Sequence, residues 1–415
     1  MSLNFKSKWT PLFLSNFLGV FNDNLLKNAV IFIAVVWSHP TWMTQSQLVS
    51  IVSGSLVIPY VFLSPAGGML AVRYSKLKIF RLFKLLELPI MAVACISFYF
   101  QWIGLAIFSV LLMGSQSALY SPSKYSLIRD IGGEEGVSFG SGIFEMMAFI
   151  GILTGTVTAS FISDRYYFGV ISAFFLAFAL MGYLVTKQIR ANELPPEQET
   201  DNTLNPVKFI LNSYRFAKRN GLVNSSVFGA SAFWLIGSIL QMNIVVHTKS
   251  VHNMSNSVTG IIMAVAAVGI ALGCWAAGKL QGKKVIPGLI LVGLSGMILT
   301  FLILTFIKTG VVVYAILVFL AAFFGGLFQI PNLSMLQNSH LARKLGDMIA
   351  YLNLVTFVFI LGGAVLFSSI MYSFHDNSYV IFGLLLLLCV LIGIYFLRKS
   401  RIFLDSMFEF FKFRK

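Results

Sequence analysis

The stretch from Ser378 to Arg398 reads SYVIFGLLLLLCVLIGIYFLR, and it carries no charged side chain before its last residue. An apolar run of about 20 residues is long enough to cross the hydrocarbon core of a bilayer as a helix. Similar runs recur along the whole chain, which is 57% hydrophobic and only 11% charged. The composition therefore predicts a polytopic membrane protein and argues against a soluble globular domain.

Hydropathy predicts an all-α integral membrane protein with twelve transmembrane helices. The predicted spans cover about residues 11–37, 47–73, 79–100, 102–122, 138–162, 167–188, 222–247, 256–281, 285–307, 310–331, 346–373 and 378–398. The first span has polar residues in its middle, and no small-residue cleavage site follows it. We therefore expect it to be a membrane helix and not a removable signal peptide.

The basic residues alternate with the predicted loops. If the N-terminus is cytoplasmic, all but four of the 30 lysines and arginines lie in or beside cytoplasmic segments, the exceptions being Lys27, Arg165, Lys249 and Lys308. The positive-inside rule then predicts that both termini are cytoplasmic. The formal charge of +15 is thus a topology signal. Because these charges are spread over short loops and not gathered on one soluble basic face, we expect no nucleic-acid partner.

A drop in hydropathy near the midpoint predicts four segments. They are an N-terminal six-helix half at 1–188, a cytoplasmic linker at 189–221, a C-terminal six-helix half at 222–398 and a basic amphipathic tail at 399–415. Pro195–Asp201 has the composition of a solvated linker. Asn205 and Pro206 then supply a cap and a first-turn proline for an amphipathic helix. We expect this helix and the tail to lie along a membrane surface rich in anionic lipid.

One polar segment interrupts the first span: Phe21-Asn22-Asp23-Asn24-Leu25-Leu26-Lys27-Asn28. A charge at the middle of a membrane helix costs about 2.5 to 3.5 kcal/mol on insertion scales, so such residues usually face a bundle interior and serve a function. Asp23 and Lys27 lie one turn apart on the same helix face. In span three, Glu87 follows Lys84 by three residues, and we interpret that pair as a structural ion pair.

An internal repeat relates the two halves. Gly67, Ala71, Arg73 and Lys78 are echoed by Gly273, Ala277, Lys279 and Lys284, and the Pro122-x4-Leu127 pattern is echoed by Pro331-x4-Leu336. Two homologous six-helix halves are typical of one class of secondary transporter. The chain resembles the major facilitator superfamily, whose loop between spans two and three carries a glycine, an acidic residue and a basic cluster. Here Val72 stands where that motif places its aspartate after Gly68.

Within that superfamily, the chain is similar to the bacterial lysophospholipid transporter family. The resemblance rests on stretches spread over nearly the whole chain: Phe21-Asn22-Asp23-Asn24, Tyr120-Ser121-Pro122-Ser123-Lys124-Tyr125, Gly142-Ile143-Phe144-Glu145, Arg219-Asn220-Gly221, Phe233-Trp234, Gly325-Gly326-Leu327-Phe328-Gln329-Ile330-Pro331-Asn332 and Leu336-Gln337. It implies an alternating-access carrier of lysophospholipids in the bacterial inner membrane. It also implies work beside an acyltransferase and acyl-carrier-protein ligase, which we expect to be a separate protein.

The cargo implied by this resemblance has one acyl chain, a phosphate and often an ethanolamine ammonium. Asp23 and Lys124 would be the opposed charges of a headgroup site, with Lys124 attracting the phosphate as a mobile point charge. Asn24 and Asn28 would supply neutral hydrogen bonds, and Glu145 would be a third buried carboxylate. The remaining residues expected at the site or along the path are Lys27, Tyr125, Gln241, Asn243, Asn332 and Gln337, of which the last four amides suit helix packing equally well.

The chain departs from the family in span seven. The family often has an arginine after Phe-Trp, whereas this chain reads Phe233-Trp234-Leu235-Ile236-Gly237-Ser238-Ile239-Leu240-Gln241. A permanent cation has become a neutral amide. Our hypothesis is that Lys27 supplies some of the missing positive charge, and we expect the headgroup preference to differ accordingly.

Two other functions fit parts of the sequence. A proton-coupled drug or metabolite antiporter of the same superfamily would use Asp23 or Glu145 as its titrating carboxylate. The Gly142-x8-Gly151-x3-Gly155 pattern resembles that of antiporters, but Thr156 stands where a proline should follow. A membrane scaffold for lipid-synthesis enzymes is the other alternative, and the charges within the spans argue against it.

Enzymatic activity is not expected. The sequence has no nucleophile with a neighbouring base, no phosphate-binding loop and no metal-ligand cluster, so we predict neither a cofactor nor a bound metal. Cys95, Cys274 and Cys389 each lie alone in an apolar run, which predicts packing residues and not a disulfide or metal site.

Overall fold

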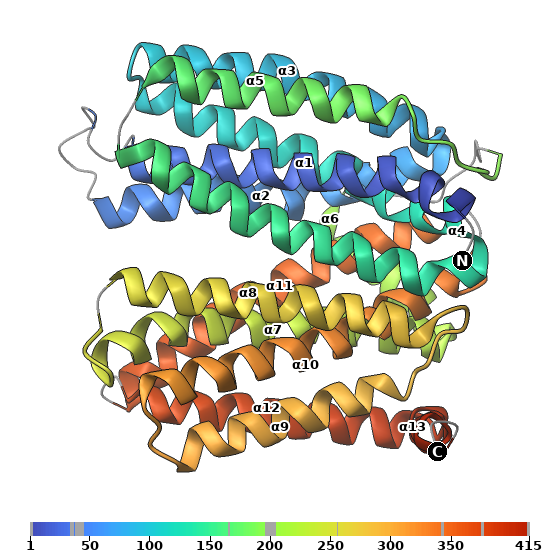
Figure 1. Ribbon diagram of the computed structural model, residues 1–415. Helices are drawn as coiled ribbons and strands as arrows, with labels where there is room; N and C mark the ends of the chain where they lie inside the picture. Colours follow the sequence, from blue (N-terminus) through green and yellow to red (C-terminus); the bar gives the residue numbers. More distant parts are fainter. Residues whose placement is uncertain are drawn as a thin grey trace. The chain divides into compact units, whose positions relative to one another are not determined.

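The structure is a computed structural model that describes residues 3–33, 37, 45–164, 167–195, 205–254, 256–341, 344–374 and 377–412. Thirteen helices and no strands occur within these ranges, which confirms the predicted all-α fold (Figure 1). They are α1 (Leu3–Ile33), α2 (Gln45–Arg73), α3 (Lys76–Tyr99), α4 (Ile103–Asp164), α5 (Phe168–Thr186), α6 (Pro206–Arg219), α7 (Gly221–Ser250), α8 (Asn256–Gln281), α9 (Leu289–Phe306), α10 (Val311–Asn338), α11 (Leu345–Ser373), α12 (Ser378–Lys399) and α13 (Ile402–Lys412). Arg165 and residues 196–204 of the predicted linker lie outside the described residues.

Nine helices in the described ranges are long and apolar enough to cross a membrane. One of them, α4, contains predicted spans four and five. A kink at Gly133, whose φ is 63°, separates the two spans. Glycine adopts this left-handed region without the steric penalty that other residues meet. The two predicted spans that miss the hydropathy criterion are α1 and α3, whose apolar runs contain Asp23, Lys27, Lys84 and Glu87. With these two helices included and α4 counted as two spans, the helices match all twelve predicted spans.

The helices form two compact units. Unit 1 comprises Met1–Ile131, Ile150–Ser213 and Leu341–Leu354, and unit 2 comprises Gly132–Phe149, Tyr214–His340 and Val355–Lys415. The chain passes between them twice within α4, once within α6, once between α10 and α11, and once within α11. The predicted segment boundaries at 188, 221 and 398 follow hydropathy and remain predictions.

In unit 1, α5 packs against both α1 and α3, and the three helices share an apolar core (Figure 1). The ring of Phe21 on α1 stacks on Phe178 of α5 with centroids 4.1 Å apart. Phe98 of α3 meets Phe175 of α5 edge-on at 5.6 Å. These aromatic contacts bury large apolar surfaces and hold α1 and α3 to α5. The face of α1 that carries Phe21, next to Asn22 and Asp23, therefore packs against α5.

In unit 2, α10 packs against α7, α8 and α9. A Cβ atom added to Gly326 of α10 would lie 2.6 Å from the backbone nitrogen of Cys274 on α8. One added to Gly293 of α9 would lie 2.7 Å from the carbonyl oxygen of Phe324 on α10. Small residues let membrane helices approach backbone to backbone, where van der Waals contact replaces the missing hydrophobic drive. Glycine therefore sets the spacing of these helices.

The sequence repeat has a structural counterpart. A Cβ on Gly67 of α2 would lie 2.6 Å from the carbonyl oxygen of Ala118 on α4. At the equivalent position in unit 2, Gly273 of α8 approaches the carbonyl oxygen of Phe323 on α10 in the same way. Each glycine thus brings the second and fourth spans of its half into backbone contact, as the predicted repeat requires.

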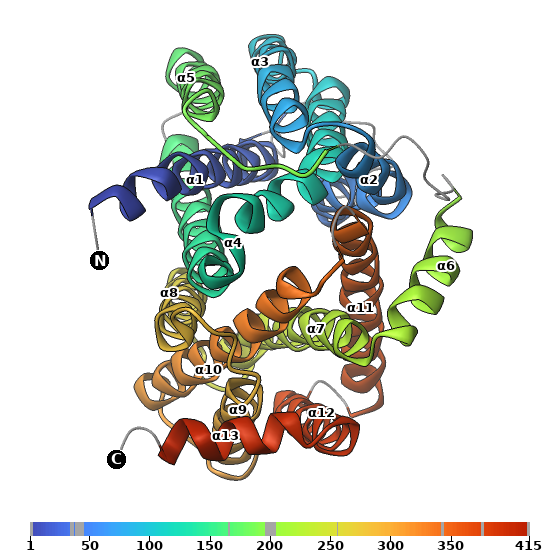
Figure 2. The same ribbon diagram turned by 90° about the vertical axis from the view of Figure 1, so that its right-hand side faces the viewer.

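Of the two short helices, α6 begins where its sequence indicates, and α13 docks on unit 2. The side chain of Asn205 accepts hydrogen bonds from the backbone N–H groups of Val207 and Lys208 at 3.0 and 3.2 Å, which caps α6 where predicted. The tail helix α13 lies across the ends of α9 and α12 (Figure 2). The backbone N–H of Gly288 donates to Ser406 Oγ at 3.1 Å, and Phe403 is fully buried. One aromatic residue of the tail is therefore used for packing on unit 2.

Candidate functional site

A polar face of α1 forms one side of the candidate site in unit 1. Asn16, Gly19, Asp23 and Lys27 follow one another at spacings of three or four residues, which places them on one face of the helix. Asp23 and Lys27 are partly exposed, whereas Asn16 is buried. The Lys27 ammonium donates to Asn24 Oδ1 at 3.4 Å. The structure thus keeps both charges of the predicted segment on the same side of α1.

The first part of α4 supplies the opposing polar groups. Ser117 Oγ donates to the Asp23 carboxylate at 3.3 Å. The Lys124 ammonium donates to Asn16 Oδ1 at 3.1 Å and lies over the rings of Tyr120 and Tyr125, 5.4 and 5.5 Å from their centroids. Such ring faces attract a cation electrostatically. Lys124 therefore lies in the same polar region of unit 1 as Asp23, about two helix turns away along α1 and α4.

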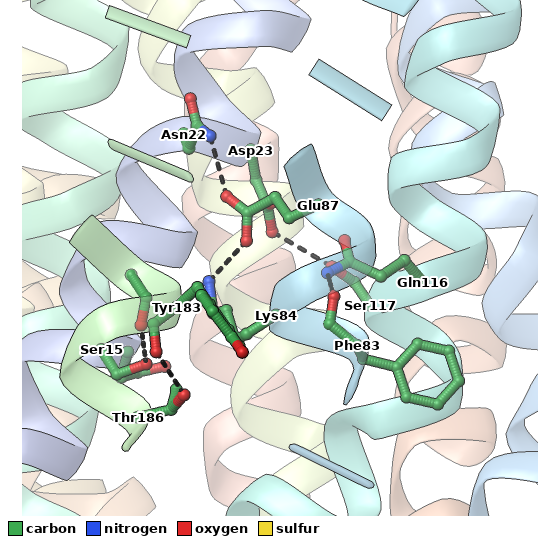
Figure 3. Close-up of polar contacts among 12 residues, drawn as sticks. Ser15, Asn22, Asp23, Phe83, Lys84, Glu87, Gln116, Ser117, Tyr183 and Thr186 are labelled. Atoms are coloured by element: carbon green, nitrogen blue, oxygen red, sulfur yellow. Dashed lines mark hydrogen bonds and ion pairs between the residues drawn. The ribbon is translucent and has the colours of Figure 1, made fainter. Parts of the chain in front are cut away.

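A second pair of charges, Lys84 and Glu87, lies close to Asp23 (Figure 3). Lys84 and Glu87 of α3 form an ion pair at 2.7 Å, and each side chain is only 1% exposed. This confirms the predicted pairing. Asn22 donates from Nδ2 to Glu87 Oε1 at 2.8 Å, so the pair also contacts the polar segment of α1. Both Lys84 and Glu87 act electrostatically on Asp23, as does Lys124. The term "charged cluster of unit 1" is used below for Asp23, Lys84, Glu87 and Lys124.

The two asparagines predicted at the site have packing partners. Asn28 Nδ2 donates to Thr156 Oγ1 on the last part of α4 at 2.9 Å and to the Asn24 carbonyl oxygen at 2.8 Å. Asn24 Nδ2 donates to the carbonyl oxygen of Val20 at 2.8 Å. Each side chain is 8% exposed. Thr156, which stands where antiporters are expected to have proline, thus binds α1 through its hydroxyl group.

The other predicted residues belong to unit 2. Glu145 is buried and acts electrostatically on Cys274 of α8, while Gln337 Oε1 accepts a hydrogen bond from Ser141 at 3.3 Å. Asn243 Nδ2 donates to the carbonyl oxygen of Ser378 at 3.2 Å. Gln241, in contrast, is exposed. These side chains lie on three different helices, α4, α7 and α10.

Asn332 has the environment of a packing residue. Its Nδ2 donates to the Phe328 carbonyl oxygen at 2.7 Å within α10, and its side chain fills the space where a Cβ of Gly229 on α7 would lie. Its Oδ1 has no hydrogen-bond partner among the described residues. Of the two interpretations that the sequence left open for this amide, the geometry favours packing between α7 and α10.

Several residues of the candidate site were not predicted. They are Asn16 and Gly19 on α1, Tyr60 on α2, and Ser117 and Tyr120 on α4. Tyr60 and Tyr120 both interact with Ser117 beside Asp23. Ser117, Tyr120 and Lys124 follow a helical spacing of three and four residues, so the signal was present in the sequence once Lys124 had been identified. Asn16 and Tyr60 have no such signal, because their positions depend on how α1 and α2 pack.

The described residues contain no group of three or more His, Cys, Asp or Glu side chains that could hold a metal ion. The polar groups instead offer one carboxylate, from Asp23, and two ammonium groups, from Lys27 and Lys124, with hydroxyl groups on neighbouring surfaces of α1 and α4. Such a set can bind a ligand that carries both signs of charge, because each ligand charge finds an opposite partner.

The helices pair in the same way in the two halves, and one half holds charges inside its membrane-spanning region. This combination is typical of a secondary membrane transporter. Residues 12–364 match the family model described as the Major Facilitator Superfamily, and the chain belongs to this family. It is therefore a multi-pass integral membrane protein of a transporter family and not an enzyme.

Curated relatives with similar sequences share one name. The chain is 25% identical over 347 residues to the "Lysophospholipid transporter LplT" of Pectobacterium carotovorum, covering 82% of this chain and 81% of that protein. It is 27% identical to the protein of the same name from Photorhabdus laumondii, covering 78% of both chains. The Escherichia coli protein of that name is 26% identical, again with 78% of both chains covered.

Solved structures confirm the fold. The human organic anion transporter MFSD10 (TETRAN) superposes with a TM-score of 0.74 at 13% identity, covering 95% of this chain and 99% of that one. The transporter FucP in its outward conformation gives a TM-score of 0.70 at 13% identity, with 94% and 98% covered. These identities support the architecture alone.

Proposed function

We propose that this transporter moves lysophospholipids, such as lysophosphatidylethanolamine, into the cytoplasmic leaflet of the bacterial inner membrane for re-acylation. The observation that carries the proposal is the charged cluster of unit 1. It places the Asp23 carboxylate on α1 and the Lys124 ammonium on α4, in a polar region of helices that are mostly apolar. A zwitterionic headgroup with a single acyl chain needs both charges beside an apolar flank.

Lys124 is the proposed phosphate ligand. Its ammonium has a neutral partner, Asn16 Oδ1 at 3.1 Å, and two tyrosine rings near it. A phosphate oxygen would exchange a neutral acceptor for an anionic one, and hydrogen bonds between charged groups are about twice as strong as neutral ones. Tyr125 and Tyr120 would keep the lysine side chain in place while it changes partner.

Asp23 is the proposed ligand of the headgroup ammonium. Its carboxylate accepts a hydrogen bond of 3.3 Å from Ser117, and the residue as a whole is partly exposed. Lys27, one turn further along α1, would supply positive charge in place of the arginine that Gln241 replaces. Unit 2 also contributes buried polar residues to the proposal. Their contacts between helices would change as the cargo binds, and they are Glu145, Asn243, Asn332 and Gln337.

The curated relatives support the substrate class. Three bacterial proteins named lysophospholipid transporters share 25 to 27% identity with this chain over about four fifths of their lengths. The Tyr120-Ser121-Pro122-Ser123-Lys124-Tyr125 stretch contributes Lys124 to the charged cluster and the two tyrosine rings beside it. The family relationship and the site chemistry thus point to the same cargo.

Transport would proceed by alternating access, with both termini in the cytoplasm and the two halves rocking about a central site. The functional partner would be an acyltransferase and acyl-carrier-protein ligase that consumes the delivered lysophospholipid. Neither step requires a cofactor of the transporter itself.

The test is uptake of labelled lysophosphatidylethanolamine into proteoliposomes that contain the purified protein. The proposal predicts saturable uptake that unlabelled lysophospholipid inhibits and that diacyl phospholipid does not. Protein-free liposomes give the background, which matters because lysophospholipids also enter bilayers spontaneously.

A second arm tests the antiporter alternative. If the protein moves no lysophospholipid above background, while a pH gradient drives a soluble amphiphilic cation across the same membrane, the proposal is wrong. The proton-coupled antiporter would then be the better account of Asp23.

A further inference from the structure

The Lys84–Glu87 ion pair of α3 is built into the molecule more firmly than a surface pair. Both side chains are 1% exposed, and their charged atoms are 2.7 Å apart. Two glycines make room for the ammonium. The Lys84 Nζ occupies the space that a Cβ of Gly19 on α1 would fill, and it lies 3.5 Å from the Cβ position of Gly182 on α5. The pair is therefore enclosed between α1 and α5.

Glu87 uses its second oxygen to hold α1. Asn22 Nδ2 donates to Glu87 Oε1 at 2.8 Å (Figure 3). It also donates to the carbonyl oxygen of Phe175 on α5 at 3.3 Å. Asn22 thus connects α1 with both α3 and α5. Because successive residues of a helix point about 100° apart, fixing Asn22 on this side directs Asp23 toward another side of α1. There Asp23 meets Ser117 of α4 at 3.3 Å.

Stability alone does not require this arrangement. Taking two charges out of water is expensive, and well-packed apolar residues of similar volume are often as stable as a buried ion pair or more stable. Phe21, Phe175, Phe178 and Phe98 already join the three helices by ring contacts. The ion pair adds a directional contact. The Glu87 carboxylate only accepts hydrogen bonds, so the Asn22 amide must turn its Nδ2 group toward it.

We propose that Lys84 and Glu87 are positioning residues of the transporter, which hold Asn22 and thereby fix the rotation of α1 that presents Asp23 to the headgroup ammonium. This inference rests on the proposed function and deepens it, because it assigns to α3 a part in headgroup selection. Lys84 has a distinct part in the device. It neutralises Glu87, so that Glu87 can hold Asn22 without adding a net negative charge next to Asp23.

The test compares two substrates in three variants. The apolar double variant Lys84→Met/Glu87→Leu removes the pair without leaving an unpaired buried charge. Asn22→Leu keeps the pair and removes only its connection to α1, so it tests the inference even if the double variant folds poorly. Ser15→Ala is the control, because Ser15 Oγ donates to the Gly182 carbonyl oxygen at 3.5 Å on the same α1–α5 contact without touching the pair.

Uptake is measured with lysophosphatidylethanolamine, which has an ammonium, and with lysophosphatidylglycerol, which has none. The inference predicts that Asn22→Leu and the double variant raise the KM for the ethanolamine lipid about tenfold and change the KM for the glycerol lipid less than twofold. Ser15→Ala should match wild type for both lipids.

Equal losses for both lipids, or wild-type KM values in a folded Asn22→Leu protein, would overturn the inference. Either result leaves the proposed function standing as long as the wild-type protein transports lysophospholipid. Absence of uptake by the wild-type protein contradicts the proposed function itself, so the two failures are distinguishable.

Discussion

Units 1 and 2 use similar helix pairs for different polar chemistry. In each half a glycine of the second span meets the backbone of the fourth, at Gly67 in unit 1 and Gly273 in unit 2. The interior of unit 1 then carries full charges, with an ion pair of 2.7 Å between side chains that are 1% exposed. The corresponding helices of unit 2 carry mostly amides, of which Asn332 packs against Gly229.

The difference teaches that shared architecture does not imply shared recognition. Amides can hydrogen-bond to the backbone of a neighbouring helix and serve packing, as Asn243 and Asn332 do. Charges within a spanning region carry a much larger insertion cost, so their concentration in unit 1 locates the proposed headgroup chemistry there. Unit 2 would then contribute mainly rigidity.

The largest effect is expected when the cation proposed to bind the phosphate, Lys124, is removed. Lys124→Gln should lower uptake of every lysophospholipid by about 10- to 100-fold, because a hydrogen bond to a charged group contributes roughly 1.5 to 3 kcal/mol and each 1.4 kcal/mol corresponds to a factor of about ten. Arg129→Gln on the same helix is the matched control, which should transport normally. Initial rates in proteoliposomes with equal protein content measure both, and equal rates for the two variants would show that Lys124 has no specific part in binding the phosphate.

The next effect concerns packing in unit 2. Gly229→Ala forces the Asn332 side chain out of its place and should lower the free energy of unfolding by about 1 to 3 kcal/mol, the usual range for overpacking. Gly237→Ala on the same helix is the control, because nothing lies within 4 Å of its Cβ position.

Thermal unfolding in detergent measures this loss of stability. The KM for lysophospholipid should stay the same in the folded fraction of Gly229→Ala. A changed KM with unchanged thermal stability would show that Asn332 recognises cargo, contrary to the contrast drawn here.

A smaller effect tests whether charge can be moved between the units. Lys27→Gln should reduce uptake by about twofold to fivefold, in keeping with the 0.2 to 1 kcal/mol of a partly solvated charge interaction. Adding Gln241→Lys, at an exposed position of α7, should restore uptake if Lys27 replaces the missing cation of span seven. Continued loss in the double variant would show that the two positions are not equivalent.

The smallest effect is a pH dependence confined to unit 2. Burial lowers the pKa of His252, whose ring lies 5.1 Å from that of His247. The folded protein therefore resists a proton that the unfolded chain accepts at its ordinary pKa near 6.5. Stability should be full above that pH and should decline as the pH falls through it.

Unfolding temperatures of wild type and His252→Asn between pH 5 and pH 8 measure this term. The variant should lose part of the acid sensitivity and keep the wild-type KM. An identical pH profile in both proteins would remove His252 from the account.

The fold could be predicted from sequence because membrane spans depend on local composition. Twelve apolar runs, the cap at Asn205 and the i, i+3 spacing of Lys84 and Glu87 are all local signals, and the structure contains each of them. Two spanning helices, α1 and α3, have weaker hydropathy signals than the others. The signals are weaker because these helices contain charges of the candidate site.

The arrangement of the site could be predicted only in part. Asp23 and Lys124 lie in one polar region, but the partners of Asn28 and Asn332 depend on where Thr156 and Gly229 are placed by helix packing. The same limit applies to Asn22. Its sequence neighbours indicate a polar segment, but only the packing of α1 against α3 shows that its amide holds Glu87.

The most direct test of the central claim, that the charges of unit 1 recognise the headgroup, is a competition experiment with Asp23→Asn. Lysophosphatidylethanolamine and lysophosphatidylglycerol compete for uptake into the same proteoliposomes, and the ratio of the two accumulated lipids is measured for wild type and variant. The account predicts that the variant loses uptake of the ethanolamine lipid about tenfold and retains uptake of the glycerol lipid. An unchanged ratio, whatever the absolute rates, would contradict it.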